Sequence, residues 1–110
     1  MSTGVKNDLV DEVRDALRNV IDPELGFNIV DLGLVYSIAV EGGGALITMT
    51  TTTRGCPATS FLKEGARESA SNISGVETVD VTLTYDPPWT PDMMSAEAKQ
   101  YLGAGDGVGW

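Results

Sequence analysis

The sequence predicts an α+β fold of two layers, in which helices cover one face of a small β-sheet. Apolar residues recur at three- and four-residue steps over residues 9–21, as expected of an amphipathic helix. They alternate strictly with polar residues over residues 78–85, as in a strand with one buried face. Two strand-like runs and a second helical pattern lie between these segments, which gives the order α-β-β-α-β plus a short C-terminal helix.

The first helix is expected to run from Leu9 to Ile21, because Asp22 precedes a proline and such residues are forced out of the helical region. The strand-like runs 34–40 and 45–52 follow after a loop. Residues 41–44, with three consecutive glycines, are expected to form a hairpin turn between them.

The second helix is expected to begin at Pro57, since proline suits the first helical position, and to end at Ser74-Gly75. A narrow face of apolar or small residues should pack on the sheet: Ala58, Phe61, Leu62, Gly65, Ala66, Ser69, Ala70 and Ile73. After the last strand, Pro87 and Pro88 stop a central strand. Thr90 then predicts the N-cap of a final helix that reaches about Leu102.

A chain of 110 residues is long enough for one compact domain. We expect this domain at residues 1–102, with residues 103–110, four of them glycine, as a flexible tail. No run approaches the roughly 18 apolar residues of a membrane span. The N-terminus lacks the charged-then-apolar layout of a signal peptide, so the expected location is the cytoplasm.

The charge balance and two scarce residue types narrow the function. The net charge is −9 and the seven basic residues are scattered, which argues against nucleic acids and anionic membranes as partners. No histidine is present, so a Ser–His–Asp or Cys–His centre within one chain is excluded. A single cysteine excludes an intrachain disulfide and a multi-cysteine metal site in a monomer. The chain is therefore not expected to be a self-contained enzyme.

The single cysteine, Cys56, stands between a predicted strand and a predicted helix. Unpaired amides and the helix dipole at a helix start favour an anion, so its pKa should lie below the usual value of about 8.5. Arg54 adds positive charge, Gly55 leaves room for a bulky group, and Thr53 and Pro57 flank the segment. A lone cysteine is also often only a small buried apolar residue. These observations alone leave both interpretations open.

A reactive thiolate at Cys56 has three competing uses. Nucleophilic catalysis normally needs a base beside the sulfur, and no histidine supplies one. Redox exchange normally needs a second cysteine. Ligation of a soft metal or a cluster needs further ligands from another chain, a small thiol or a client protein. Of the three uses, ligation of a metal or cluster requires the fewest groups that this chain does not itself contain.

Other residues are candidates for lining the site. Asp22, Glu24 and Asp31 are expected beside the cysteine as hard ligands or a recognition surface, or else as residues that satisfy turns. The segment 86–91, which contains Trp89, is followed by two methionines. It suits either a docking surface or a strap that covers one end of the core.

Three sequence blocks in this order and spacing resemble the SufT/PaaD-like metal–sulfur cluster assembly family, which also includes the MIP-eighteen adaptors of eukaryotes. The likeness extends from about residue 8 to residue 102. The blocks are Asp22-Pro23-Glu24-Leu25 through Asp31-Leu32-Gly33-Leu34-Val35, then Thr52-Thr53-Arg54-Gly55-Cys56-Pro57, and then Pro87-Pro88-Trp89-Thr90-Pro91-Asp92-Met93-Met94-Ser95.

The resemblance implies a two-layer domain of the iron–sulfur-assembly type and a role in maturing iron–sulfur proteins, as carrier or adaptor. The family's reactive cysteine falls on Cys56, and its acidic signature on Asp22 and Glu24. The Cys-x-x-Cys pair of related scaffold domains is missing here. The cysteine-rich C-terminal extension common in the PaaD branch is also missing, which points to a general assembly role.

The sequence thus predicts an accessory factor that transiently holds iron or an iron–sulfur cluster through Cys56. Its expected partners are iron–sulfur assembly proteins and apo client proteins, with a homodimer as one source of further ligands. The alternative is an adaptor that docks clients or assembly proteins and ligates nothing. A thiol-dependent enzyme or redox sensor is the third hypothesis, and it lacks a base.

Overall fold

The computed structural model describes residues 5–52 and 58–102. It confirms the predicted α+β class and order of elements, and no helix within the described ranges is long and apolar enough to cross a bilayer. The elements in chain order are α1 (Val5–Leu17), β1 (Val35–Glu41), β2 (Gly44–Met49), α2 (Ala58–Ser71), β3 (Thr78–Leu83), the 3₁₀ turn η2 (Pro91–Met93) and α3 (Ala96–Leu102).

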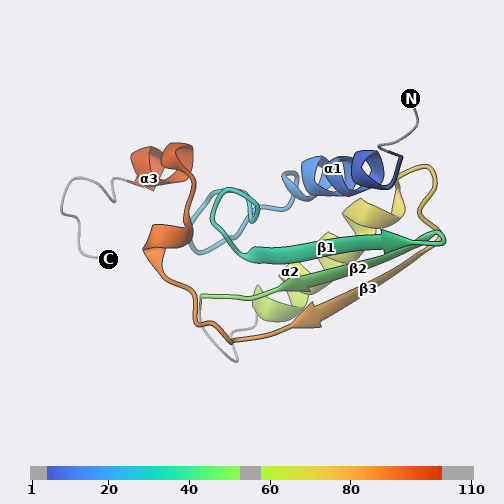
Figure 1. Cartoon of the computed structure of the whole chain (residues 1–110). Helices are drawn as coiled ribbons and strands as arrows, with labels where there is room; N and C mark the ends of the chain where they lie inside the picture. The colour runs from blue at the N-terminus through green and yellow to red at the C-terminus, as the bar shows by residue number, and fades with distance from the viewer. Residues whose placement is uncertain (1–4, 53–57, 103–110) are drawn as a thin grey trace.

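The described strands form one sheet with β2 in the centre, antiparallel to β1 and parallel to β3. Helix α1 packs on β1 and α2, and α2 packs on β3, so both helices cover the same face (Figure 1). Ala45, Ile47 and Met49 of β2 are buried on this face. The predicted alternation in β3 is confirmed, because its valines and leucine are more buried than the polar residues between them. The sheet therefore has one apolar and one polar face.

The hairpin lies where the glycine run predicts it. Glu41 pairs with Gly44, which leaves Gly42 and Gly43 as a two-residue loop. Their φ angles are 55° and 86°, and positive φ at both loop positions is the requirement of a type I′ turn. Residues with a side chain adopt this conformation only at a cost, so the glycines fix the hairpin.

The first helix ends earlier than predicted, at Leu17 rather than just before Asp22. The amides of residues 18, 19 and 20 each donate to a carbonyl three positions earlier, at 3.0–3.1 Å, which tightens and closes the last turn. Val20 is buried from the following loop, whereas Ile21 is 46% exposed. The apolar periodicity extends past the end of the helix because Val20, a loop residue, is the next buried side chain.

The C-terminal helix is interrupted, so the prediction of one helix capped by Thr90 is wrong. Thr90 makes no side-chain cap hydrogen bond, and Met94 is extended with ψ of 150°. The amide of Ser95 donates to the carbonyl of Asp31 at 2.7 Å, and the Ser95 hydroxyl accepts from the amide of Ala98 at 3.2 Å. This tertiary contact places the break and moves the cap to Ser95.

Gly33 is held against the backbone of Met93. Its φ is +80°, and a Cβ added there would overlap the Met93 carbonyl group. Gly26 has a similar φ of +73° but open space where a Cβ would be. An alanine at Gly26 would therefore meet backbone strain alone, whereas an alanine at Gly33 would meet both backbone strain and steric overlap.

We predict that Gly26→Ala lowers the free energy of unfolding by about 1–2 kcal/mol, the cost of the left-handed conformation alone. Gly33→Ala should cost at least about 2 kcal/mol more, because the chain at Met93 must move as well. Urea unfolding of both variants measures the difference. Equal costs would show that the close approach of Gly33 to Met93 contributes nothing.

Candidate functional site

The described candidate residues gather at one end of the sheet. Figure 1 shows the start of β1, the ends of β2 and β3 and the start of α2 at this same end. The predicted thiol segment joins β2 to α2 there, but its residues lie outside the described part of the chain: Thr53, Arg54, Gly55, Cys56 and Pro57. The described residues around it establish how this end is built.

The chain leaves β2 through two buried threonines. The amide of Thr50 donates to the carbonyl of Leu34 at 2.8 Å. The hydroxyl of Thr51 lies 2.9 Å from the hydroxyl of Tyr85, which follows β3. Both threonines are almost completely buried. This polar strand end is therefore tied to the neighbouring strands on both sides, immediately before residues 53–57.

Tyr36 links β1 to the proline-rich segment. Its hydroxyl donates to the carbonyl of Pro87 at 2.8 Å and lies 3.7 Å from the sulfur of Met93. Burial raises the pKa of Tyr36 above its ordinary value of 10.0, and a hydrogen bond with Thr50 opposes that rise. The register of β1 shifts around Tyr36, between Val35 and Ser37. Such a bulge re-aims a side chain, and no sequence pattern signalled it.

Residues 84–94, which we call the strap, cover this end of the core. The indole of Trp89 donates from Nε1 to the carbonyl of Leu32 at 2.7 Å, and its ring packs against the core cluster. Met94 is buried, whereas Met93 remains partly exposed. Trp89 is thus held by the loop before β1 and contributes to the closure of the core.

The acidic candidates form turns in the described structure. Asp22 is 2% exposed, and its Oδ1 accepts hydrogen bonds from the amides of Glu24 and Leu25 at 2.7 and 3.2 Å. The Oδ2 of Asp31 accepts from the Asn28 amide group at 2.8 Å. Within the described ranges, no three aspartate or glutamate side chains converge closely enough to hold a metal ion. The observed geometry is that of turn-stabilising carboxylates.

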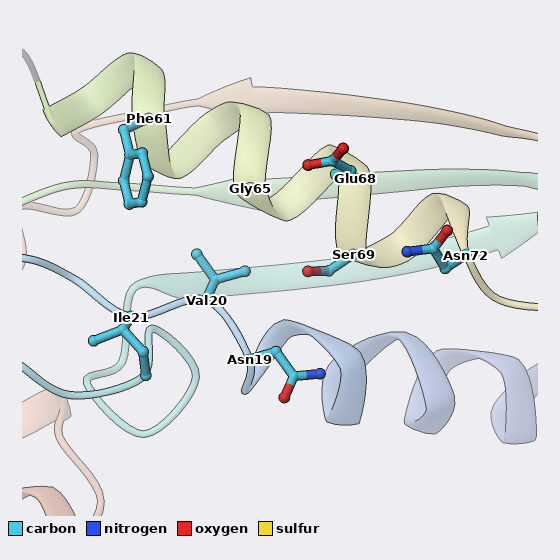
Figure 2. A pocket seen from close by; sticks show the side chains of 8 residues that line it. All are labelled: Asn19, Val20, Ile21, Phe61, Gly65, Glu68, Ser69 and Asn72. Carbon is cyan, nitrogen blue, oxygen red and sulfur yellow. The ribbon is translucent and has the colours of Figure 1, made fainter.

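A groove of about 540 Å³ lies between the end of α1 and α2, and Figure 2 shows its side chains. Phe61 is 59% exposed there, so its predicted packing on the sheet is wrong, whereas Leu62 and Ala66 of the same predicted face are buried. Sequence reasoning missed the groove. Its lining residues are Asn19, Val20, Ile21, Phe61, Gly65, Glu68, Ser69 and Asn72.

Comparison with known proteins agrees with this fold. The sequence model of the family described as "Iron-sulfur cluster assembly protein" matches residues 10–83. An Fe-S protein maturation auxiliary factor of Porphyromonas gingivalis is 44% identical over 88 residues, which cover 79% of this chain and 84% of the relative. The auxiliary factor SufT of Staphylococcus aureus is 42% identical, over 76% of this chain and 97% of the relative.

A crystal structure from Bacillus anthracis, of a domain of unknown function, superposes with a TM-score of 0.85 at 38% identity, covering 90% of this chain and 95% of that one. The fold thus defines a class of small two-layer α+β proteins. The chain belongs to the iron–sulfur cluster assembly family. The SufT-like resemblance found in the sequence blocks is confirmed.

Substitution of Asp22 separates its turn hydrogen bonds from its charge. Asp22→Asn keeps an Oδ1 acceptor, so its cost in unfolding free energy should stay below about 1 kcal/mol. Asp22→Ala leaves the amides of Glu24 and Leu25 without this acceptor and should cost about 1–3 kcal/mol. Denaturant unfolding measures both. A large loss in Asp22→Asn would mean that the negative charge itself stabilises the fold.

The raised pKa of Tyr36 predicts a loss of stability at high pH. Because the folded protein holds this phenolic proton more tightly, the contribution is complete below about pH 10 and is lost as the pH rises through the folded pKa. NMR titration of the tyrosine ring carbons should place the Tyr36 pKa above 10.0, with Tyr36→Phe assigning the resonance. A titration midpoint below 10.0 would contradict the burial effect.

Proposed function

We propose that this protein is an accessory factor in iron–sulfur protein maturation that holds iron or a cluster transiently at Cys56 and passes it on. One observation carries the proposal: in a chain of the iron–sulfur cluster assembly family, the single cysteine stands two positions before Ala58, where α2 begins. The unpaired amides at the start of a helix favour a negatively charged group. A thiolate is the form of cysteine that ligates iron.

The absence of histidine and of a second cysteine decides the kind of ligation. One chain supplies one soft ligand, whereas a cluster bound by protein thiolates normally takes four. The remaining ligands then come from a second copy, a small thiol or the apo client itself. Shared ligation favours transfer, because the cluster leaves when the client's own thiolates replace the single bond to Cys56. No catalytic step is needed.

The environment of this end of the sheet supports the proposal. Thr50 and Thr51 fix the chain just before the thiol segment, and α2 begins just after it. Thr53, Arg54, Gly55 and Pro57 are proposed to shape the approach to the sulfur. Glu24 and Trp89 are proposed to contribute to recognition of assembly proteins or apo clients in the cytoplasm. Asp22 and Asp31 are proposed to contribute indirectly, because their hydrogen bonds hold the loop that supports this end.

Anaerobic reconstitution tests the proposal directly. The full chain, mixed with ferric iron, sulfide and a small thiol and then separated from unbound reagents by gel filtration, should retain visible absorption and transfer the cluster to an apo ferredoxin. Cys56→Ala should retain none, because the only thiolate is removed. Asp80→Asn is the control, since it removes one negative charge from the open face of β3, away from the candidate site. Equal cluster content in the wild type and in Cys56→Ala would overturn metal handling at Cys56.

The alternative function is that of an adaptor that ligates nothing, and the exposed groove at Ile21 and Phe61 favours it. Complementation separates the two functions. In cells that lack this protein, Cys56→Ala should fail to restore iron–sulfur enzyme activity if the thiol handles metal. Full restoration by a folded Cys56→Ala variant would establish the adaptor instead.

A further inference from the structure

The groove between α1 and α2 concentrates apolar surface. Five large apolar residues are exposed in the described part of the chain, and Ile21 and Phe61, at 46% and 59%, both line this groove. Figure 2 shows the Phe61 ring directed from α2 toward the chain at Val20 and Ile21. Paired exposure of this kind marks a binding surface more often than single exposed residues do.

The floor of the groove is made by Val20 and Gly65. A Cβ added to Gly65 would lie 3.2 Å from Cγ1 of Val20, so the missing side chain is what lets Val20 approach α2. Ser69 on α2 and Asn72, the residue just after the end of α2, continue this side of the groove. The result is a shallow floor between an apolar end at Phe61 and a polar end.

The polar end is negatively charged. Glu68 is the single carboxylate among the lining residues, which include no lysine or arginine. Glu64, one turn away on α2, pairs with Arg67 at 3.4 Å, whereas within the described residues Glu68 has no ion-pair partner. The net charge of −9 adds to the negative potential. The groove is therefore complementary to an apolar side chain followed by a cation.

We propose that this groove binds a peptide segment of a partner protein that carries an apolar side chain for Ile21 and Phe61 and a lysine or arginine for Glu68. Phe61 and Glu68 are separated by about 10 Å along the axis of α2, at 1.5 Å per residue. An extended peptide covers this distance in about three residues. The recognised pattern is then apolar–x–x–basic, with small residues over Val20 and Gly65.

The negative charge of the chain favours a basic peptide in this groove over a second copy of the chain or an anionic membrane. A second copy of the chain would bring another net charge of −9 toward Glu68, and an anionic membrane would also be repelled. The inference goes beyond metal handling, because none of the groove residues is a proposed ligand. A partner bound here would lie along the helix whose first turn follows Cys56.

Display of random eight-residue peptides against the full chain tests the proposal, without iron or sulfide. The enriched peptides should carry the apolar–x–x–basic pattern. For the best synthetic peptide, Phe61→Ser should raise the Kd by about tenfold or more, as for a central apolar anchor. Glu68→Lys should raise it by about threefold at low salt and shift the preference to acidic peptides.

Matched controls lie on the open face of the sheet. Leu46→Ser changes a residue that is 47% exposed on β2, and Asp80→Lys repeats the charge reversal on β3. Both should leave the Kd unchanged, as should Cys56→Ala. Failure to enrich any peptide, enrichment without a basic residue, or equal losses in Phe61→Ser and Leu46→Ser would overturn the proposal. Because cluster binding is not measured, these outcomes leave the role of Cys56 untouched.

Discussion

The buried loop before β1 is the element on which the rest of the structure depends. Ile29, Leu32 and Leu34 are completely buried although they lie outside every described helix and strand. Burial of irregular backbone requires hydrogen bonds for its polar groups, and this loop obtains them from distant segments. The carbonyl of Asp31 accepts from Ser95, that of Leu32 from Trp89 and that of Leu34 from Thr50.

These three hydrogen bonds explain why the candidate site has a defined shape. The bond from Thr50 holds the end of β2, and the bonds from Trp89 and Ser95 hold the strap and the start of α3. The acidic residues of the same region serve the loop, since Asp22 closes one turn and Asp31 accepts from Asn28. The loop therefore supports the end of the sheet from which the thiol segment departs.

The sequence predicted the features that depend on local pattern. The alternation of Val79, Val81 and Leu83 revealed β3, and the glycine pair Gly42-Gly43 revealed the hairpin, because both rules act within a few residues. The family could also be recognised, since the three blocks together are specific. The placement of Cys56 beside a helix start remains a prediction from Pro57.

The features that the sequence did not predict are set by contacts between distant segments. The sequence predicted Ile21 and Phe61 on buried faces, but both are exposed. Periodicity marks an apolar stripe without showing how much of it a small sheet can cover. The break at Met94 depends on a hydrogen bond between Ser95 and Asp31. The direction of Tyr36 depends on a bulge whose position no residue type announces.

Different parts of helix α2 serve the core, the proposed peptide groove and the proposed thiol site at its start. Leu62, Ala66 and Ala70 face the core, while Phe61 and Glu68 face the groove. A single thiolate before this helix would bind any soft metal that reached it, so selection of a client must come from other contacts. A groove on the same rigid helix supplies them at a fixed distance from the helix start. The proposed thiol and the proposed peptide groove are therefore complementary, because one provides the ligand and the other determines which protein receives the cargo.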